Sequence, residues 1–185
     1  MANQNLFITS NAAYETWIKK KIPTVQKDFQ LKHERMTESP FFFFRAVFFR
    51  WSELWINSKS GFLQAPAVLS VGDLHLENFG TWRDSEGRLC WGVNDFDEAY
   101  PLPYLFDIVR LASSVLVACE FEHLSIKPKL AFESIISGYV KGLQKGGQPF
   151  VLEEDNSWLR ETAVERLRKA PKFWKKISTI DKRIM

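Results

Sequence analysis

The stretch Val71–Gly80, VGDLHLENFG, carries four polar side chains within a short, otherwise apolar segment. They are Asp73, His75, Glu77 and Asn78. Carboxylate, amide and imidazole groups can bind a divalent cation or take part in proton transfer. The chemistry to be considered for this stretch is therefore metal binding and acid–base catalysis.

The spacing within this stretch is more specific than its composition. Asp73 and Asn78 have the separation found in the catalytic loop of protein kinases, where the Asp orients the substrate hydroxyl and the Asn holds a metal ion. A second stretch, NDFDEAY, spans Asn94–Tyr100 and contains Asp95 and Asp97. Phosphoryl transfer needs a carboxylate beside the nucleophile and hard oxygen ligands for Mg²⁺. We therefore expect both stretches to belong to one site, with the Asp73 and Asp95 carboxylates converging on one cleft.

A small β segment is predicted around these stretches. The apolar run Ala67–Val71 reads as a buried strand that leads into Asp73. Residues 79–93 read as a hairpin with its turn at Asp84–Gly87. Helical patterns come before and after this region. The sequence thus predicts an α+β fold, mainly helical with a small central β-hairpin or sheet.

An aromatic helix is predicted before the strand, from Ser39-Pro40 to about Ser58. Aromatic side chains recur in it at spacings of three and four, so that the helix is apolar almost all round and should be central. We expect Phe44, Phe48 and Trp51 to be buried against the β segment.

A long helix is predicted to begin near Tyr104, after two prolines. Asp107, Arg110 and Ser114 share one of its faces, because their spacing is three and four. We expect Asp107 and Arg110 to form a buried pair that anchors the loop of Asp73, with Asp107 accepting backbone N–H groups or pairing with Arg110.

Composition narrows the class of protein. The chain has 185 residues, of which 45% are hydrophobic and 25% charged, a globular balance. A net charge of +3 without a stripe of basic and aromatic residues argues against a nucleic-acid partner. The apolar run FFFFRAVFF is too short to span a membrane. Two cysteines, Cys90 and Cys119, form no disulfide framework, and reduced thiols in a cytoplasmic protein are expected.

Two further features are predicted near the end of the chain. They are a last helix from Asp155 or Asn156 to Pro171 and a solvated basic stretch at 166–183.

Several motifs in order resemble a known family. GDLHLENFG and NDFDEAYPLPYLFDIVRLASS are similar to a bacterial family of unknown function defined by GD-x-H-x-x-NFG, NDFDE and D-x-x-RLA-x-S. SPFFFFRA resembles that family's SPF-x-F-x-R-G segment, with Ala46 at the usual Gly. The resemblance covers roughly residues 35–139. The family is similar in turn to aminoglycoside phosphotransferases and other kinase-like enzymes, which carry H-G-D-x-H-x-x-N and then I-D-F/W-x-x-A.

This resemblance implies a function and roles for individual residues. It implies part of a kinase-like catalytic lobe that uses ATP and Mg²⁺ to phosphorylate an unknown small molecule. Asp73 matches the catalytic carboxylate, and His75 matches a His common inside the phosphotransferase loop. Asn78 and Asp95 match the residues that hold the metal and its nucleotide, and Asp97 is a candidate second metal ligand. Asp107 matches an Asp that steadies the catalytic loop from a helix. Two departures are Val71, where a His is usual, and Asp97, where protein kinases have Gly.

A phosphate-gripping segment is missing from the pattern. Before the Gly72-Asp73 pair the chain contains one glycine, Gly61, and no G-x-G-x-x-G motif, although kinase-like sites use such a loop and a Lys. We therefore expect residues 1–185 to be a single domain that is a short or partial version of a longer kinase-like domain. Its missing part would be a C-terminal segment or a protein partner, and the chain alone should bind ATP weakly and transfer no phosphate.

Other readings remain open. The acidic side chains and His75 could form a metal-dependent hydrolase. The chain could also be a non-catalytic remnant or pseudoenzyme that binds a partner. Asp and Asn residues commonly satisfy backbone N–H groups in turns, and His75 could support the loop by hydrogen bonding.

Overall fold

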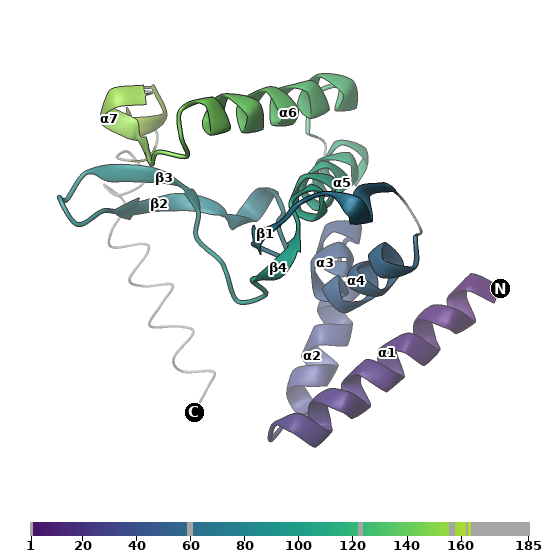
Figure 1. The fold of residues 1–185 in the computed structure, drawn as a ribbon. Coiled ribbons are helices and arrows are strands. Elements are labelled where there is room, and N and C mark those ends of the chain that lie inside the picture. The colour runs from purple at the N-terminus through teal and green to yellow at the C-terminus, as the bar shows by residue number, and fades with distance from the viewer. Residues whose placement is uncertain (1, 59–60, 122–123, 156–157, 162, 164–185) are drawn as a thin grey trace. The chain divides into compact units, whose positions relative to one another are not determined.

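The computed structural model describes residues 2–58, 61–121, 124–155, 158–161 and 163 (Figure 1). The chain divides into two compact units, which are described separately below. One unit comprises Met1–Leu76 and Phe96–Lys141, and the other comprises Glu77–Asp95 and Gly142–Met185. Both acidic stretches thus begin in one unit and end in the other. The expectation of one domain, as a partial version of a longer one, stays a prediction.

The first unit holds most of the helices and a two-stranded sheet. Its elements are α1 (Ala2–Lys21), α2 (Gln26–Met36), α3 (Pro40–Ala46), α4 (Phe48–Asn57), a 3-10 helix (Gly61–Gln64), β1 (Ala67–Ser70), β4 (Tyr100–Pro103), α5 (Leu105–Phe121) and all but the end of α6 (Pro128–Gln144).

Strands β1 and β4 pair antiparallel, with Ala67 opposite Pro103 and Ser70 opposite Tyr100. The predicted strand is therefore confirmed, but its predicted burial is wrong. Ser70 is buried, whereas Leu69 is 76% exposed. A sheet of two strands can cover little of either face by itself.

The predicted aromatic helix is broken in the middle. Ser39 caps α3 by accepting a hydrogen bond from the Phe42 N–H, as the Ser-Pro pair indicated. Val47, with φ −113° and ψ 31°, leaves helical geometry and separates α3 from α4. The β-branched side chain of Val47 fits a helix less well than its neighbours do, and it is buried. The prediction of one continuous helix to Ser58 is thus wrong at this residue.

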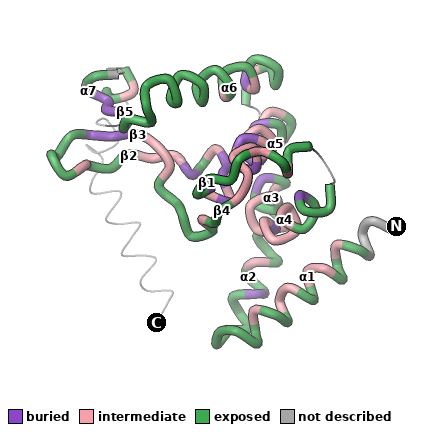
Figure 2. Tube along the Cα trace, viewed as in Figure 1, coloured by how far each residue is buried: buried purple, intermediate pink, exposed green. Residues whose placement is uncertain are grey.

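The core of the first unit is centred on α5, where buried residues gather along the helix (Figure 2). Phe106 is 1% exposed, and the rings of Phe48, Trp51 and Trp55 lie edge-on to it at 5.9, 6.3 and 5.3 Å. The aromatic helices therefore pack against α5 rather than the β segment. Phe44, like Phe48 and Trp51, is only partly buried, which corrects the prediction of full burial.

The second unit is built on the predicted hairpin. Strands β2 (Phe79–Arg83) and β3 (Leu89–Val93) pair antiparallel, and β5 (Phe150–Val151) pairs with the other edge of β3. The short 3-10 helix Leu76–Asn78 precedes β2, and α7 (Leu152–Asp155) follows β5. The last predicted helix, as far as Pro171, and the basic stretch 166–183 lie largely outside the described residues.

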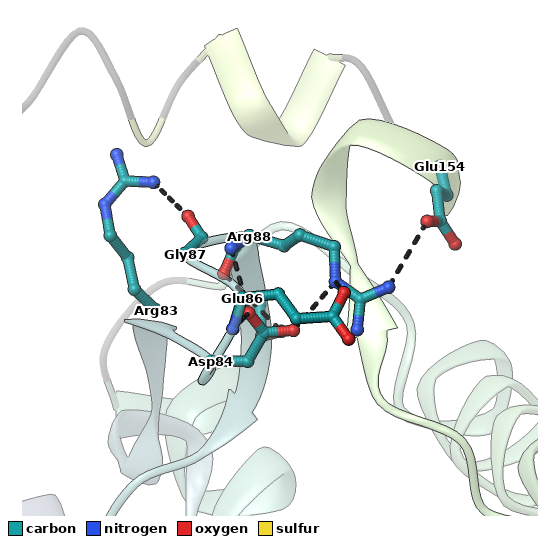
Figure 3. A network of polar contacts seen from close by, with 7 residues as sticks. Arg83, Asp84, Glu86, Gly87, Arg88 and Glu154 are labelled. Carbon is teal, nitrogen blue, oxygen red and sulfur yellow. Dashed lines mark hydrogen bonds and ion pairs between the residues drawn. The ribbon is translucent and has the colours of Figure 1, made fainter.

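The hairpin turn lies at Asp84–Gly87, as predicted, and the Asp84 side chain closes it. Its carboxylate accepts hydrogen bonds from the N–H groups of Glu86 and Arg88 at 3.0 and 2.9 Å and from the Arg88 Nε at 2.9 Å (Figure 3). Gly87 has φ +81°, a backbone conformation that glycine adopts without steric cost. This chemistry explains why the turn could be located from the sequence.

The predicted α+β class, mainly helical with small sheets, is confirmed. Both cysteines are free thiols, with Cys90 buried in β3. None of the helices in the described part of the chain is long and apolar enough to cross a membrane.

Candidate functional site

One face of α5 holds the loop that carries Asp73. The Asp107 carboxylate accepts hydrogen bonds from the backbone N–H groups of Val71 and Gly72, at 2.7 and 3.0 Å. Burial raises the pKa of Asp107, whereas the two N–H groups act in the opposite direction. The prediction that Asp107 steadies the loop through backbone N–H groups is confirmed.

Arg110 binds Asp73 itself, one helical turn further along α5. Its Nε and Nη2 atoms donate to Asp73 Oδ1 at 3.0 and 2.6 Å. The predicted pair of Asp107 with Arg110 is therefore wrong, because each residue contacts a different part of the loop. Residues three positions apart lie on the same face of a helix, so Asp107 and Arg110 can both reach one segment while each binds a different part of it.

Ser114 provides the third contact from this face. Its Oγ accepts the N–H of Leu76 at 3.2 Å and donates to the Leu111 carbonyl at 2.7 Å. Ser114 is completely buried. Asp107, Arg110 and Ser114 therefore contact successive points of the loop from Val71 to Leu76.

The Arg110 guanidinium lies among aromatic rings. Its central carbon is 3.5 Å from the Phe44 ring centroid, 5.1 Å from that of Trp51 and 5.6 Å from that of Phe48. Nη2 also donates to the Phe44 carbonyl oxygen at 2.8 Å. Burial lowers the pKa of Arg110, while the attraction of Asp73 and its hydrogen bonds oppose this shift. The cation is stabilised by an ion pair, a carbonyl dipole and ring faces in place of water.

His75 is only 2% exposed. Its ring meets that of Phe41 edge-on, with the ring centroids 5.9 Å apart. Burial at this level favours the support of the loop, one of the two roles considered for His75, over direct contact with a substrate.

Two glycines of the first acidic stretch lie against the second stretch. Gly72 has φ +92°, and a Cβ atom on it would lie 2.3 Å from the Glu98 carbonyl oxygen. A Cβ atom on Gly80 would lie 2.3 Å from Nδ2 of Asn94. The first contact is within the first unit, and the second is within the other unit. Within each unit, the residues of the first acidic stretch therefore pack directly on residues of the second acidic stretch.

The remaining predicted ligands are divided between the units. Asn78 is buried in the second unit, and its carbonyl oxygen accepts the N–H of Asn94 at 2.9 Å. Asp95 is exposed two residues after β3 in the same unit, and Asp97 is exposed in the first unit. Since Asp73 and Asp95 belong to different units, their convergence on one cleft stays a prediction.

The candidate ligands are chemically suited to Mg²⁺, because carboxylate and amide oxygens are its preferred protein ligands and two of the three residues are exposed. Within the described part of the chain, no three His, Cys, Asp or Glu side chains are grouped so as to hold a metal ion. The predicted set is of a different kind, because it includes an asparagine and spans both units.

Sequence reasoning missed two functional contacts of α5, those of Arg110 with Asp73 and of Ser114 with Leu76. The sequence did contain a signal for them, because Arg110 and Ser114 follow Asp107 at spacings of three and four residues and so share its helix face. The partner of each side chain could not be inferred, because it depends on how α5 packs on a loop more than thirty residues earlier in the chain.

Comparisons with known proteins identify a family. Residues 24–176 match the family model described as an uncharacterised protein conserved in bacteria, DUF2252, and the chain belongs to this family. Neither a search of curated proteins nor a search of solved structures found a match.

Proposed function

We propose that this DUF2252 protein is a kinase-like phosphotransferase that transfers a phosphoryl group from ATP, with Mg²⁺, to a hydroxyl group of an unidentified small molecule. The motif resemblance supplies the reaction class. The observation that carries the proposal is the anchoring of the Asp73 loop by one helix face, through Asp107, Arg110 and Ser114. A carboxylate that orients a hydroxyl must be held in a fixed position, because positioning provides much of the catalysis in phosphoryl transfer.

The proposed roles follow from these contacts and from the motif positions. Asp73, whose side chain is 20% exposed, orients the substrate hydroxyl and receives its proton. Asn78, Asp95 and Asp97 would hold Mg²⁺, which would neutralise charge on the phosphates when bound. His75 supports the loop from its buried position.

The test compares nucleotide binding with and without Mg²⁺, measured by titration calorimetry. It should use the 185-residue chain and any longer product of the same reading frame. We expect weak or no binding by the short chain and Mg²⁺-dependent binding by the longer one. Asp95→Asn should remove the Mg²⁺ dependence. Asp28→Asn, the same change at an exposed position in α2, should leave it unchanged. Absence of nucleotide binding by both forms would refute the proposal.

The two alternatives give different results in the same assays. A metal-dependent hydrolase would cleave a phosphate ester such as p-nitrophenyl phosphate without ATP, and chelation would stop it. A binding module would neither transfer phosphate from ATP nor cleave the ester. The burial of His75 argues against the hydrolase, because that reading needs the imidazole near the reacting atoms.

A further inference from the structure

We propose that Arg110 is a positioning residue that fixes the side chain of Asp73 for catalysis, and that the aromatic helices α3 and α4 exist in part to hold its guanidinium. This inference rests on the proposed function, because it assigns Asp73 the catalytic carboxylate. It goes beyond that function by identifying the group that orients this carboxylate.

The two partners of the ion pair differ in exposure. The Arg110 side chain is 1% exposed, whereas that of Asp73 is 20% exposed. Burial of both groups would strengthen the attraction between them but would also remove the hydration of the carboxylate. Here the cation is enclosed and the carboxylate reaches the surface of the first unit. This asymmetry suits a carboxylate that meets a substrate while its orientation is fixed from behind.

The contacts of Arg110 require a planar guanidinium. Nε and Nη2 both reach Oδ1 of Asp73, and Nη2 also reaches the Phe44 carbonyl. The central carbon of the guanidinium lies over the Phe44 ring, 3.5 Å from its centroid. A lysine ammonium is a compact point charge and cannot make these contacts from the same backbone position.

The break between α3 and α4 contributes to this arrangement. Phe44 lies in the last turn of α3, where backbone carbonyls lack a partner from the next turn. Its carbonyl oxygen is therefore available to accept the hydrogen bond from Arg110. One residue, Phe44, thus binds the guanidinium through both its ring and its backbone.

Asp107 and Arg110 anchor different parts of the loop that carries Asp73. Asp107 binds only the backbone N–H groups of Val71 and Gly72 among the contacts described above, and Arg110 binds the Asp73 side chain. Loss of Arg110 should therefore loosen the orientation of the carboxylate while the loop backbone stays in place.

The experiment measures this separation by NMR. The χ1 rotamer of Asp73 is read from three-bond couplings to its Cγ, and the protection of the Val71 and Gly72 amides is read from hydrogen exchange. We expect one Asp73 rotamer in the wild-type chain and averaged couplings in Arg110→Lys, with amide protection retained. Asp107→Asn should show the reverse pattern, with lost protection of the two amides.

A second variant keeps the test decisive if Arg110→Lys does not fold. Phe44→Leu removes the ring above the guanidinium but retains the backbone carbonyl and both charges, and it should also average the Asp73 couplings. Unchanged Asp73 couplings in the folded variants would overturn the inference, as would a loss of amide protection equal to that of Asp107→Asn.

The rotamer measurement needs no nucleotide, so it fails or succeeds independently of the proposed function. In a form that turns over ATP, Arg110→Lys should lower turnover at saturating Mg²⁺ and ATP by about 100-fold. The affinity of this variant for the nucleotide should be unchanged, because Arg110 is not among the residues proposed to hold the metal. Weaker nucleotide binding with unchanged turnover would contradict a positioning role.

Discussion

Gly72 and Glu98 are in such close contact that a Cβ atom on Gly72 would lie 2.3 Å from the Glu98 carbonyl oxygen. The residue before the proposed catalytic Asp73 therefore lies directly against the backbone of the second acidic stretch. Gly72 also has φ +92°, so a side chain there would be strained as well as obstructed. This contact shows why a glycine is required in the GD motif of this chain.

Gly72→Ala should lower the free energy of unfolding by more than about 3 kcal/mol, since backbone strain alone costs about 1–3 kcal/mol and a clash with backbone is added. The measurement is urea denaturation followed by circular dichroism. Gly87→Ala is the matched control, because Gly87 has φ +81° but nothing within 4 Å of its Cβ position. It should lose only about 1–2 kcal/mol. Equal losses for the two variants would show that the contact with Glu98 is unimportant.

Gly80→Ala should be destabilising for a different reason. Its Cβ would meet the Asn94 side chain, which can move, and no positive φ adds strain. Gly80→Ala should therefore cost much less stability when it is introduced into an Asn94→Ala background than when it is introduced into the wild-type chain. Both losses are measured in the same denaturation assay. Additive losses in this double-mutant cycle would mean that the two residues do not interact.

Asp107 should make stability depend on pH in a defined direction. Its folded-state pKa is raised above the ordinary 3.8, chiefly by burial. The folded state then binds the proton more tightly than the unfolded state, so stability falls as the pH rises from the unfolded pKa through the folded pKa. Asp107→Asn lacks this titration. The difference in unfolding free energy, wild type minus Asp107→Asn, should therefore decrease as the pH increases above about 4, measured by urea denaturation at several pH values. An increase would reverse the sign and contradict the burial effect.

Phe106 should contribute more to stability than any exposed aromatic residue. It is 1% exposed and is surrounded by rings from α4. Phe106→Ala should cost about 3–5 kcal/mol. Phe48→Ala should cost about 2 kcal/mol, because this side chain is only partly buried and removes less area from water.

Phe121→Ala serves as the control for these variants, since Phe121 is 48% exposed at the end of α5. Its loss in the same denaturation assay should be the smallest of the three. A loss for Phe48→Ala as large as that for Phe106→Ala would show that Phe48 belongs to the closed core.

Local chemistry made several elements predictable from the sequence. The turn at Asp84–Gly87 combines an Asp that accepts nearby N–H groups with a glycine at positive φ, and both features act within four residues. Ser39 before Pro40 identified the start of a helix, because the cap is a contact between neighbours. The shared face of Asp107, Arg110 and Ser114 followed from helical spacing alone.

The identity of the contacts across the fold was decided by tertiary structure. The sequence showed that Asp107 and Arg110 lie on one helix face, and it left open whether Asp107 binds backbone N–H groups of the loop or pairs with Arg110. Only the packing of α5 against the loop decided that Asp107 binds the backbone of Val71 and that Arg110 binds Asp73. Likewise, the helical spacing of the aromatic residues predicted one continuous helix, and only the structure showed the break at the buried Val47. Sequence determines the contacts that form within a few residues, whereas a partner that is distant along the chain is selected by which surfaces the packed core brings together.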